Sequence, residues 1–104
     1  MKKTIEIDGN KYEIITDYRE GYQKEDFLNR YTDYFKDYDY IVGDWAYGKL
    51  RLKGFYEDNN KKSNKMNKIS NLDKYIEENC AYGCKYFVAK KVIVWYTILI
   101  IEEV

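Results

Sequence analysis

The sequence contains no histidine and no proline, and only two of its 104 residues are cysteines. Without histidine, the chain lacks the commonest general base and the commonest neutral metal ligand. Two thiols alone cannot complete a tetrahedral zinc site, which takes four ligands. Net charge is missing as well, because 18 basic and 18 acidic residues cancel. These absences argue against histidine-dependent and metal-dependent catalysis, and against nucleic-acid binding driven by bulk positive charge.

A long hydrophobic run is also absent. The longest run without a charge, VIVWYTILII at Val92–Ile101, falls well short of the roughly 20 apolar residues that span a bilayer. The N-terminus MKKTIEIDGN has two lysines but no apolar segment typical of a signal peptide. We therefore expect a cytoplasmic protein without membrane contact, folded as a single domain over residues 1–104.

The stretch DYIVGDWAYGKLRLKGF at Asp39–Phe55 is typical of a β-hairpin. Two runs of β-branched, aromatic and apolar residues flank a connection that contains glycine. We place Trp45 opposite Leu50 across the connection of residues 46–49, because a three-residue loop would bury Asp44. One face of this hairpin is then wholly apolar and is predicted to join the core. It carries Ile41, Gly43, Trp45, Leu50, Leu52 and Gly54.

The opposite face of the hairpin is the candidate contact surface. In the chosen register Asp44 lies opposite Arg51 and Tyr40 lies opposite Phe55, which are favourable cross-strand pairs. With Tyr47 in the connection, the aromatic and charged side chains form one surface. The residues predicted to bind a partner are Tyr40, Asp44, Tyr47, Arg51, Lys53 and Phe55.

The remaining segments predict a second hairpin and two helices. Thr4–Ile7 and Lys11–Ile15 flank an Asp8-Gly9 turn, which sets Ile5 opposite Tyr12. Apolar residues recur at helical spacing over Lys24–Lys36, after a loop at residues 16–23. A second helix begins with Ser70 as its N-cap and ends near residue 79.

A polar run and two C-terminal stretches complete the predicted fold. Residues 57–68 are polar and are expected to form a mobile loop. Lys85–Ala89 is predicted to be a strand, and residues 92–104 an apolar strand or tail that pairs in the sheet or with a second copy of the chain. The predicted fold is α+β: a mostly antiparallel sheet of two hairpins and the C-terminal strands, packed on one face by two helices.

Cys80 and Cys84 allow several roles. They serve a metal only if the site is shared across a dimer, since four ligands are needed. At a helix C-terminus the dipole does not favour a nucleophilic thiolate. A disulfide fits the spacing, but cytosolic thiols are kept reduced. We therefore interpret both residues as small, apolar packing residues.

Two segments of this sequence resemble a known family. The motif D-W-x-Y-G-x-L-R-L-K-G-F within Tyr38–Tyr56, followed by C-x-x-x-C within Ile69–Val88, is similar to the YutD-like family of small bacterial proteins. The resemblance covers about residues 12–91. It implies a cytoplasmic α+β domain, and it brings no activity, cofactor or catalytic residue. The apolar tail beyond Val92 is longer than the family pattern.

The predicted function is that of a non-catalytic binding or regulatory module whose hairpin face contacts a protein partner. The alternative is a single-stranded RNA or DNA partner on the same face, with aromatic rings stacking on bases and basic side chains contacting phosphates. Catalysis is the third class. Its only acid–base candidates are Asp39 and Asp44, and their positions place them on different faces. No cofactor is expected.

Overall fold

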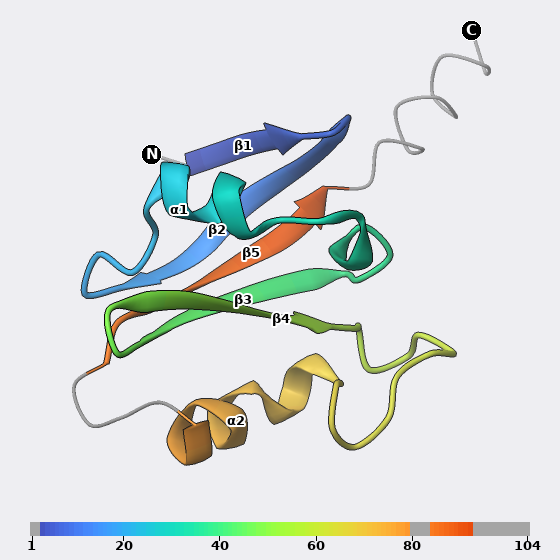
Figure 1. Ribbon diagram of the computed structural model, residues 1–104. Coiled ribbons are helices and arrows are strands. Elements are labelled where there is room, and N and C mark those ends of the chain that lie inside the picture. The colour runs from blue at the N-terminus through green and yellow to red at the C-terminus, as the bar shows by residue number, and fades with distance from the viewer. Residues whose placement is uncertain (1–2, 80–83, 93–104) are drawn as a thin grey trace, which may run out of the picture.

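The computed structural model describes residues 3–79 and 84–92, which form one five-stranded sheet with two α-helices. The strands follow the order β1-β2-β5-β3-β4, and every neighbouring pair is antiparallel (Figure 1). The α+β prediction is confirmed. The elements are β1 (Lys3–Ile7), β2 (Asn10–Tyr18), α1 (Lys24–Arg30), the 3-10 turn η1 (Asp33–Phe35), β3 (Tyr40–Ala46), β4 (Lys49–Phe55), the 3-10 turn η2 (Ile69–Asn71), α2 (Leu72–Asn79) and β5 (Tyr86–Val92).

Both hairpins have the predicted registers. Ile5 lies opposite Tyr12 in the first hairpin, and Trp45 lies opposite Leu50 in the second. The second turn is tighter than expected, because residues 46 and 49 also pair and leave a two-residue turn. Both residues of each turn have positive φ, as in type I′ turns, whose twist matches that of the flanking strands.

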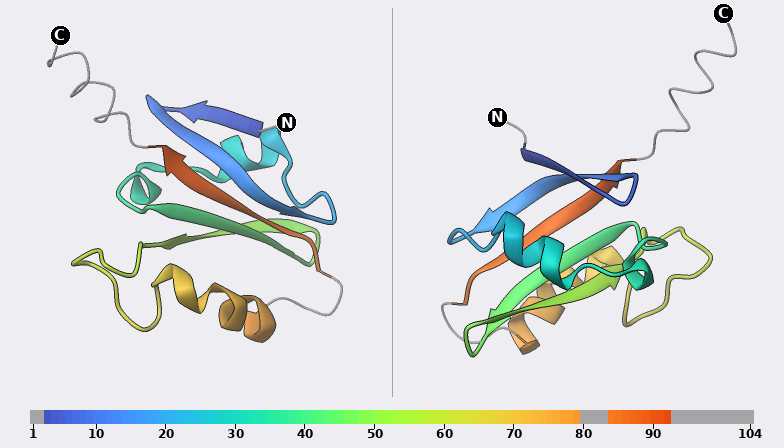
Figure 2. Two further views of the ribbon diagram at one scale, coloured as in Figure 1. Left: turned by 180° about the vertical axis from the view of Figure 1, so that it is seen from behind. Right: turned by 45° about the horizontal axis from the view of Figure 1, so that its top comes forward.

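The sheet has a hydrophobic core on each of its faces. On the α1 side, Phe27 packs with Tyr12, Ile41 and Phe87. On the other side, a second cluster is covered by apolar side chains of η2 and α2. The cluster consists of Tyr40, Val42, Phe55 and Val88, and the covering residues include Ile69, Leu72, Tyr75 and Ile76. Helices α1 and α2 therefore lie on opposite faces of the sheet (Figure 2), and the expectation that both pack on one face is wrong.

The first helix is shorter than the predicted Lys24–Lys36, and β2 is longer than expected. Helix α1 ends at Arg30, because Tyr31 adopts an extended conformation. This turn of the backbone brings the Tyr31 hydroxyl within 3.0 Å of the Tyr12 hydroxyl in the core, so that two buried polar groups pair. β2 continues to Tyr18, into the stretch predicted as a loop, and pairs there with β5.

The polar run at residues 57–68 carries a network of hydrogen bonds that its composition does not predict. Tyr56 N–H donates to the Asn67 carbonyl, and Ile69 N–H donates to the Tyr56 carbonyl, both at 2.8 Å. The Asn64 side chain accepts from the amides of Met66 and Asn67. The C-terminal end of the run is thereby tied to Tyr56, the residue that follows β4.

The described C-terminal part of the chain lies in the centre of the sheet. β5 pairs with β2 on one side and with β3 on the other. Cys84 is disulfide-bonded, so the expectation of a reduced packing residue does not hold for it. Cys80 and the tail predicted to pair or dimerise lie outside the described residues. Among the described residues, no helix has the length and apolarity needed to cross a membrane.

Candidate functional site

The hairpin face predicted as a contact surface is largely covered by α2. Tyr40 is 7% exposed, and Asp44 and Phe55 are fully buried. The prediction that this face is open to a partner is therefore wrong, although its register is right. The second apolar cluster explains this burial. Apolar side chains of α2 pack against the rings of Tyr40 and Phe55, and the contact removes both surfaces from water. The three other candidates, Tyr47, Arg51 and Lys53, remain accessible in part or in full.

Arg51 connects the buried face to the end of α2. Its guanidinium forms an ion pair with Asp44, and it also donates to the Asn79 carbonyl at 3.0 Å. The hydrogen bond to the Asp44 carboxylate raises the pKa of Arg51. The second carboxylate oxygen of Asp44 has no hydrogen-bond partner among the residues that the structure describes. Arg51 thus compensates a buried charge while its own side chain stays 48% exposed.

Tyr47 is the most exposed large hydrophobic side chain in the described part of the molecule. It occupies the first turn position of the β3–β4 hairpin, where its φ is 53°, and its exposed fraction is 102%. Left-handed conformations are uncommon for bulky residues, and Asn or Asp is preferred at such positions. The ring therefore gains no internal packing from a conformation that tyrosine rarely adopts.

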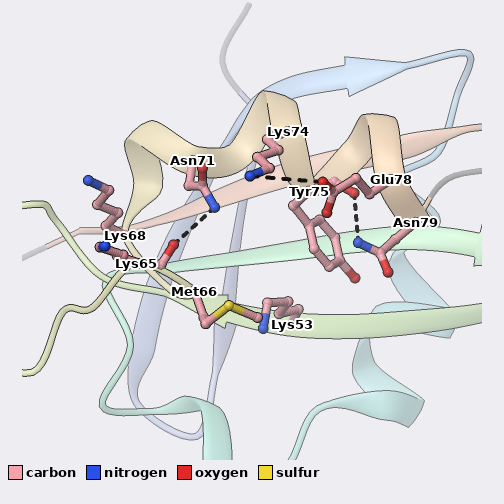
Figure 3. A pocket seen from close by; sticks show the side chains of 9 residues that line it. All are labelled: Lys53, Lys65, Met66, Lys68, Asn71, Lys74, Tyr75, Glu78 and Asn79. Atoms are coloured by element: carbon pink, nitrogen blue, oxygen red, sulfur yellow. Dashed lines mark hydrogen bonds and ion pairs between the residues drawn. The ribbon is translucent and has the colours of Figure 1, made fainter.

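A basic groove lies between β4, the polar run and α2, with a volume of about 570 Å³ (Figure 3). Four lysines from these three segments line it. They are Lys53, Lys65, Lys68 and Lys74. The rest of the lining comes from Met66, Asn71, Tyr75, Glu78 and Asn79. We call these nine residues the basic groove.

Several contacts hold the walls of the basic groove. The Lys53 ammonium lies 5.6 Å from the centre of the Tyr75 ring, within the range of a cation–π contact. The Asn71 side chain donates to the Lys65 carbonyl at 3.0 Å, which ties the polar run to η2. Burial raises the pKa of Tyr75, the Asp44 carboxylate raises it further, and Arg51 lowers it. The groove is therefore built from anchored segments and presents positive charge.

Sequence reasoning found Lys53 but missed its three partners in the groove. Lys65 and Lys68 belong to the polar run at residues 57–68, which the sequence predicts to be a mobile loop, and Lys74 faces outward from α2. No local pattern indicates that these side chains meet, because they converge only when α2 packs on the sheet. The apolar stripe of α2 was the available signal, since it required an apolar face as its partner.

The two carboxylates considered for catalysis have structural partners. One Asp39 oxygen accepts from the Glu57 amide at 2.8 Å and from the Asn60 side chain at 3.0 Å, which anchors the polar run. Asp44 is buried and paired with Arg51. Among residues 3–79 and 84–92, no three metal-binding side chains gather at one point.

Comparison with known proteins places this architecture in a family. Residues 6–90 match the family described as "Putative antitoxin YutD-like". The chain belongs to the YutD-like family. A relative from Bacillus subtilis, named "Putative antitoxin YutD", is 49% identical over 88 residues, which cover 85% of this chain and 97% of that protein. The solution NMR structure of yutD from B. subtilis matches with a TM-score of 0.73 and 48% identity, over 86% of this chain and 82% of that one.

Proposed function

We propose that this YutD-like protein is a non-catalytic binding module that acts as an antitoxin, binding a toxic protein partner and neutralising it. The name of the B. subtilis relative, which is 49% identical, supports the antitoxin role. Tyr47 supports a binding surface at the β3–β4 turn. The full exposure of this tyrosine at a turn position with positive φ is the observation that carries the proposal.

Tyr47 occupies a position where both the turn geometry and the exposure disfavour tyrosine. Stability favours asparagine before Gly48, because both positions of the turn have positive φ. Folding favours a polar residue at a position that is fully exposed. A tyrosine here satisfies neither requirement, and unfavourable local conformations concentrate at functional positions. Tyrosine is also enriched among the residues that dominate binding energy at protein interfaces.

The proposed contact surface extends from Tyr47 along the exposed edge of β4. Arg51 and Lys53 follow on this strand, and both belong to the predicted contact residues. Lys53 continues into the basic groove. A protein that contacts the turn can therefore reach a rigid, positively charged surface beside it.

Single-stranded nucleic acid is the alternative partner. Its predicted mode of binding required the rings of Tyr40 and Phe55 to stack on bases, and both rings are buried under α2. The lysines of the groove can still contact phosphates, so the alternative is tested by salt dependence and nuclease treatment.

The replacement of Tyr47 by asparagine separates function from folding. Tyr47→Asn creates the favoured Asn-Gly turn, so we expect a protein at least as stable as the wild type. Affinity capture from nuclease-treated extract of the native cell should retain a protein partner with the wild type and lose it with Tyr47→Asn. The matched control is Tyr34→Asn, which removes a 68% exposed tyrosine elsewhere on the molecule.

The captured protein then gives the test of the antitoxin role. Expressed alone it should stop growth, and co-expression of the wild type should restore growth better than Tyr47→Asn does. A partner that binds Tyr47→Asn as tightly as the wild type would refute the proposed surface. A captured component that nuclease removes would favour the nucleic-acid alternative.

A further inference from the structure

The described lining of the basic groove carries more positive than negative charge. Glu78 is its one acidic lining residue, and its carboxylate lies 4.0 Å from the Lys74 ammonium. Lys53 and Lys65 form no ion pair with any residue that the structure describes. Lys68 has a carboxylate nearby, because the hydrogen bonds of Ser70 lower the pKa of Asp58 and the charge of Lys68 lowers it further. Four lysines and one glutamate therefore line the groove, and this excess of positive charge favours an anionic occupant.

We infer that the basic groove binds an acidic segment of the protein partner, in which several aspartate or glutamate side chains meet these lysines. The inference rests on the proposed function and adds the chemistry of the partner. A volume of about 570 Å³ lies within the range of about 300–1,000 Å³ typical of ligand sites. It therefore accommodates several side chains of an extended segment, and the positions of the lysines in three separate segments suit more than one carboxylate.

The described groove suits carboxylates better than a nucleic-acid strand. Base stacking provides much of the affinity for single strands, at about 1–3 kcal/mol per base. Tyr75 is the one aromatic ring that lines the groove, and the Lys53 ammonium already lies over it. The groove is therefore left with charge contacts and no ring open for stacking.

The start of η2 offers no phosphate site at this groove either. Backbone amides at the beginning of a helix are common phosphate donors. Here the Ser70 amide donates to the Asp58 carboxylate at 3.0 Å, so this donor is already occupied. The lysine side chains remain as the groups that can bind an anion here. Each presents a point charge that suits a single carboxylate.

The test measures binding of a fluorescein-labelled octapeptide of glutamate, with an octapeptide of glutamine and an oligouridine of eight nucleotides as the other probes. The double variant Lys65→Gln, Lys68→Gln removes two charges from the groove and leaves its apolar contacts in place. The matched control is Lys24→Gln, Lys36→Gln, which removes two exposed charges on the α1 side. Circular dichroism and urea unfolding check that both variants fold.

We expect the wild type and the control to bind the glutamate peptide equally, and the groove variant to bind it about tenfold more weakly. The glutamine peptide should bind weakly to all three proteins. Equal binding of the glutamate peptide to the groove variant and the control would overturn the inference. So would an oligouridine that binds more tightly than the glutamate peptide and depends on the same two lysines.

The captured partner distinguishes this inference from the proposed function. If the partner binds the groove variant normally but loses affinity for Tyr47→Asn, the antitoxin proposal stands and the acidic-segment inference fails. If nuclease-treated extract gives no protein partner for the wild type, the proposed function fails, whatever the peptide does.

Discussion

Replacing Arg51 with alanine tests how the exposed edge of β4 supports the buried face of the sheet. The substitution removes the ion pair with Asp44 and the hydrogen bond to the Asn79 carbonyl at the end of α2. An exposed ion pair contributes only about 0.2–1 kcal/mol to stability. Asp44, however, is fully buried, and its other carboxylate oxygen already lacks a hydrogen-bond partner in the described part of the chain. The substitution therefore leaves a buried charge uncompensated.

The magnitude follows from this burial. Removal of one partner of a buried ion pair costs about 3–5 kcal/mol. Because the Arg51 side chain is 48% exposed, solvent already screens part of the interaction, and we expect a smaller loss of about 2–3 kcal/mol. A domain of ordinary stability has about 5–15 kcal/mol, so Arg51→Ala should still fold at low temperature.

Urea unfolding at pH 7 measures this loss, with Asp44→Asn as the second arm of a double-mutant cycle. Asparagine at position 44 carries no charge, so the double variant Asp44→Asn, Arg51→Ala should be more stable than Arg51→Ala alone. The reasoning is refuted if Arg51→Ala loses less than about 0.5 kcal/mol, the usual range of an ordinary surface change. It also fails if neutralising Asp44 gives no rescue.

Two further predictions concern the scaffold. Gly43→Ala should lose about 1–3 kcal/mol in urea unfolding, because the added methyl group would overlap the ring of Phe87, and full stability of this variant would contradict the packing. Asn64→Ala should speed amide hydrogen exchange at Met66 and Asn67, whose N–H groups donate to the Asn64 side chain at 2.8 and 3.0 Å. Exchange in the variant at the wild-type rate would show that these bonds do not order the polar run.

The sheet register could be predicted because local chemistry determines it. Alternation of apolar residues and the glycine-containing turns fix which residues face each other, and a slip of one residue would expose the core. The pairs Ile5 with Tyr12 and Trp45 with Leu50 follow from these rules and are present in the structure.

The covering of the second sheet face could not be predicted from the hairpin alone. Asp44, Arg51 and Lys53 made this face look solvated, because three of its six residues are charged. In the structure, Arg51 and Lys53 lie on the edge strand, where the Arg51 side chain stays exposed and the Lys53 ammonium lies over the Tyr75 ring, so their neighbours can be buried. The buried carboxylate is tolerated because Arg51 pairs with it.

The basic groove could not be predicted from the sequence for a related reason. Its lysines come from β4, the polar run and α2, and each is ordinary in its own segment. Their convergence depends on where α2 docks and on the hydrogen bonds that tie the run to β4. Both are long-range consequences of packing that composition does not encode locally.

The most direct test of the proposed binding surface is a ¹H–¹⁵N correlation spectrum of the full chain, titrated with the glutamate octapeptide. The amide shifts should concentrate at Lys53, Lys65 and Lys74, and those of Lys24 on the α1 side should not move. The shifts should also disappear as salt is raised, because charge contacts carry the binding. Shifts that gather on the α1 side, or a spectrum that does not change at all, would contradict the assignment of the groove as the site for an acidic segment.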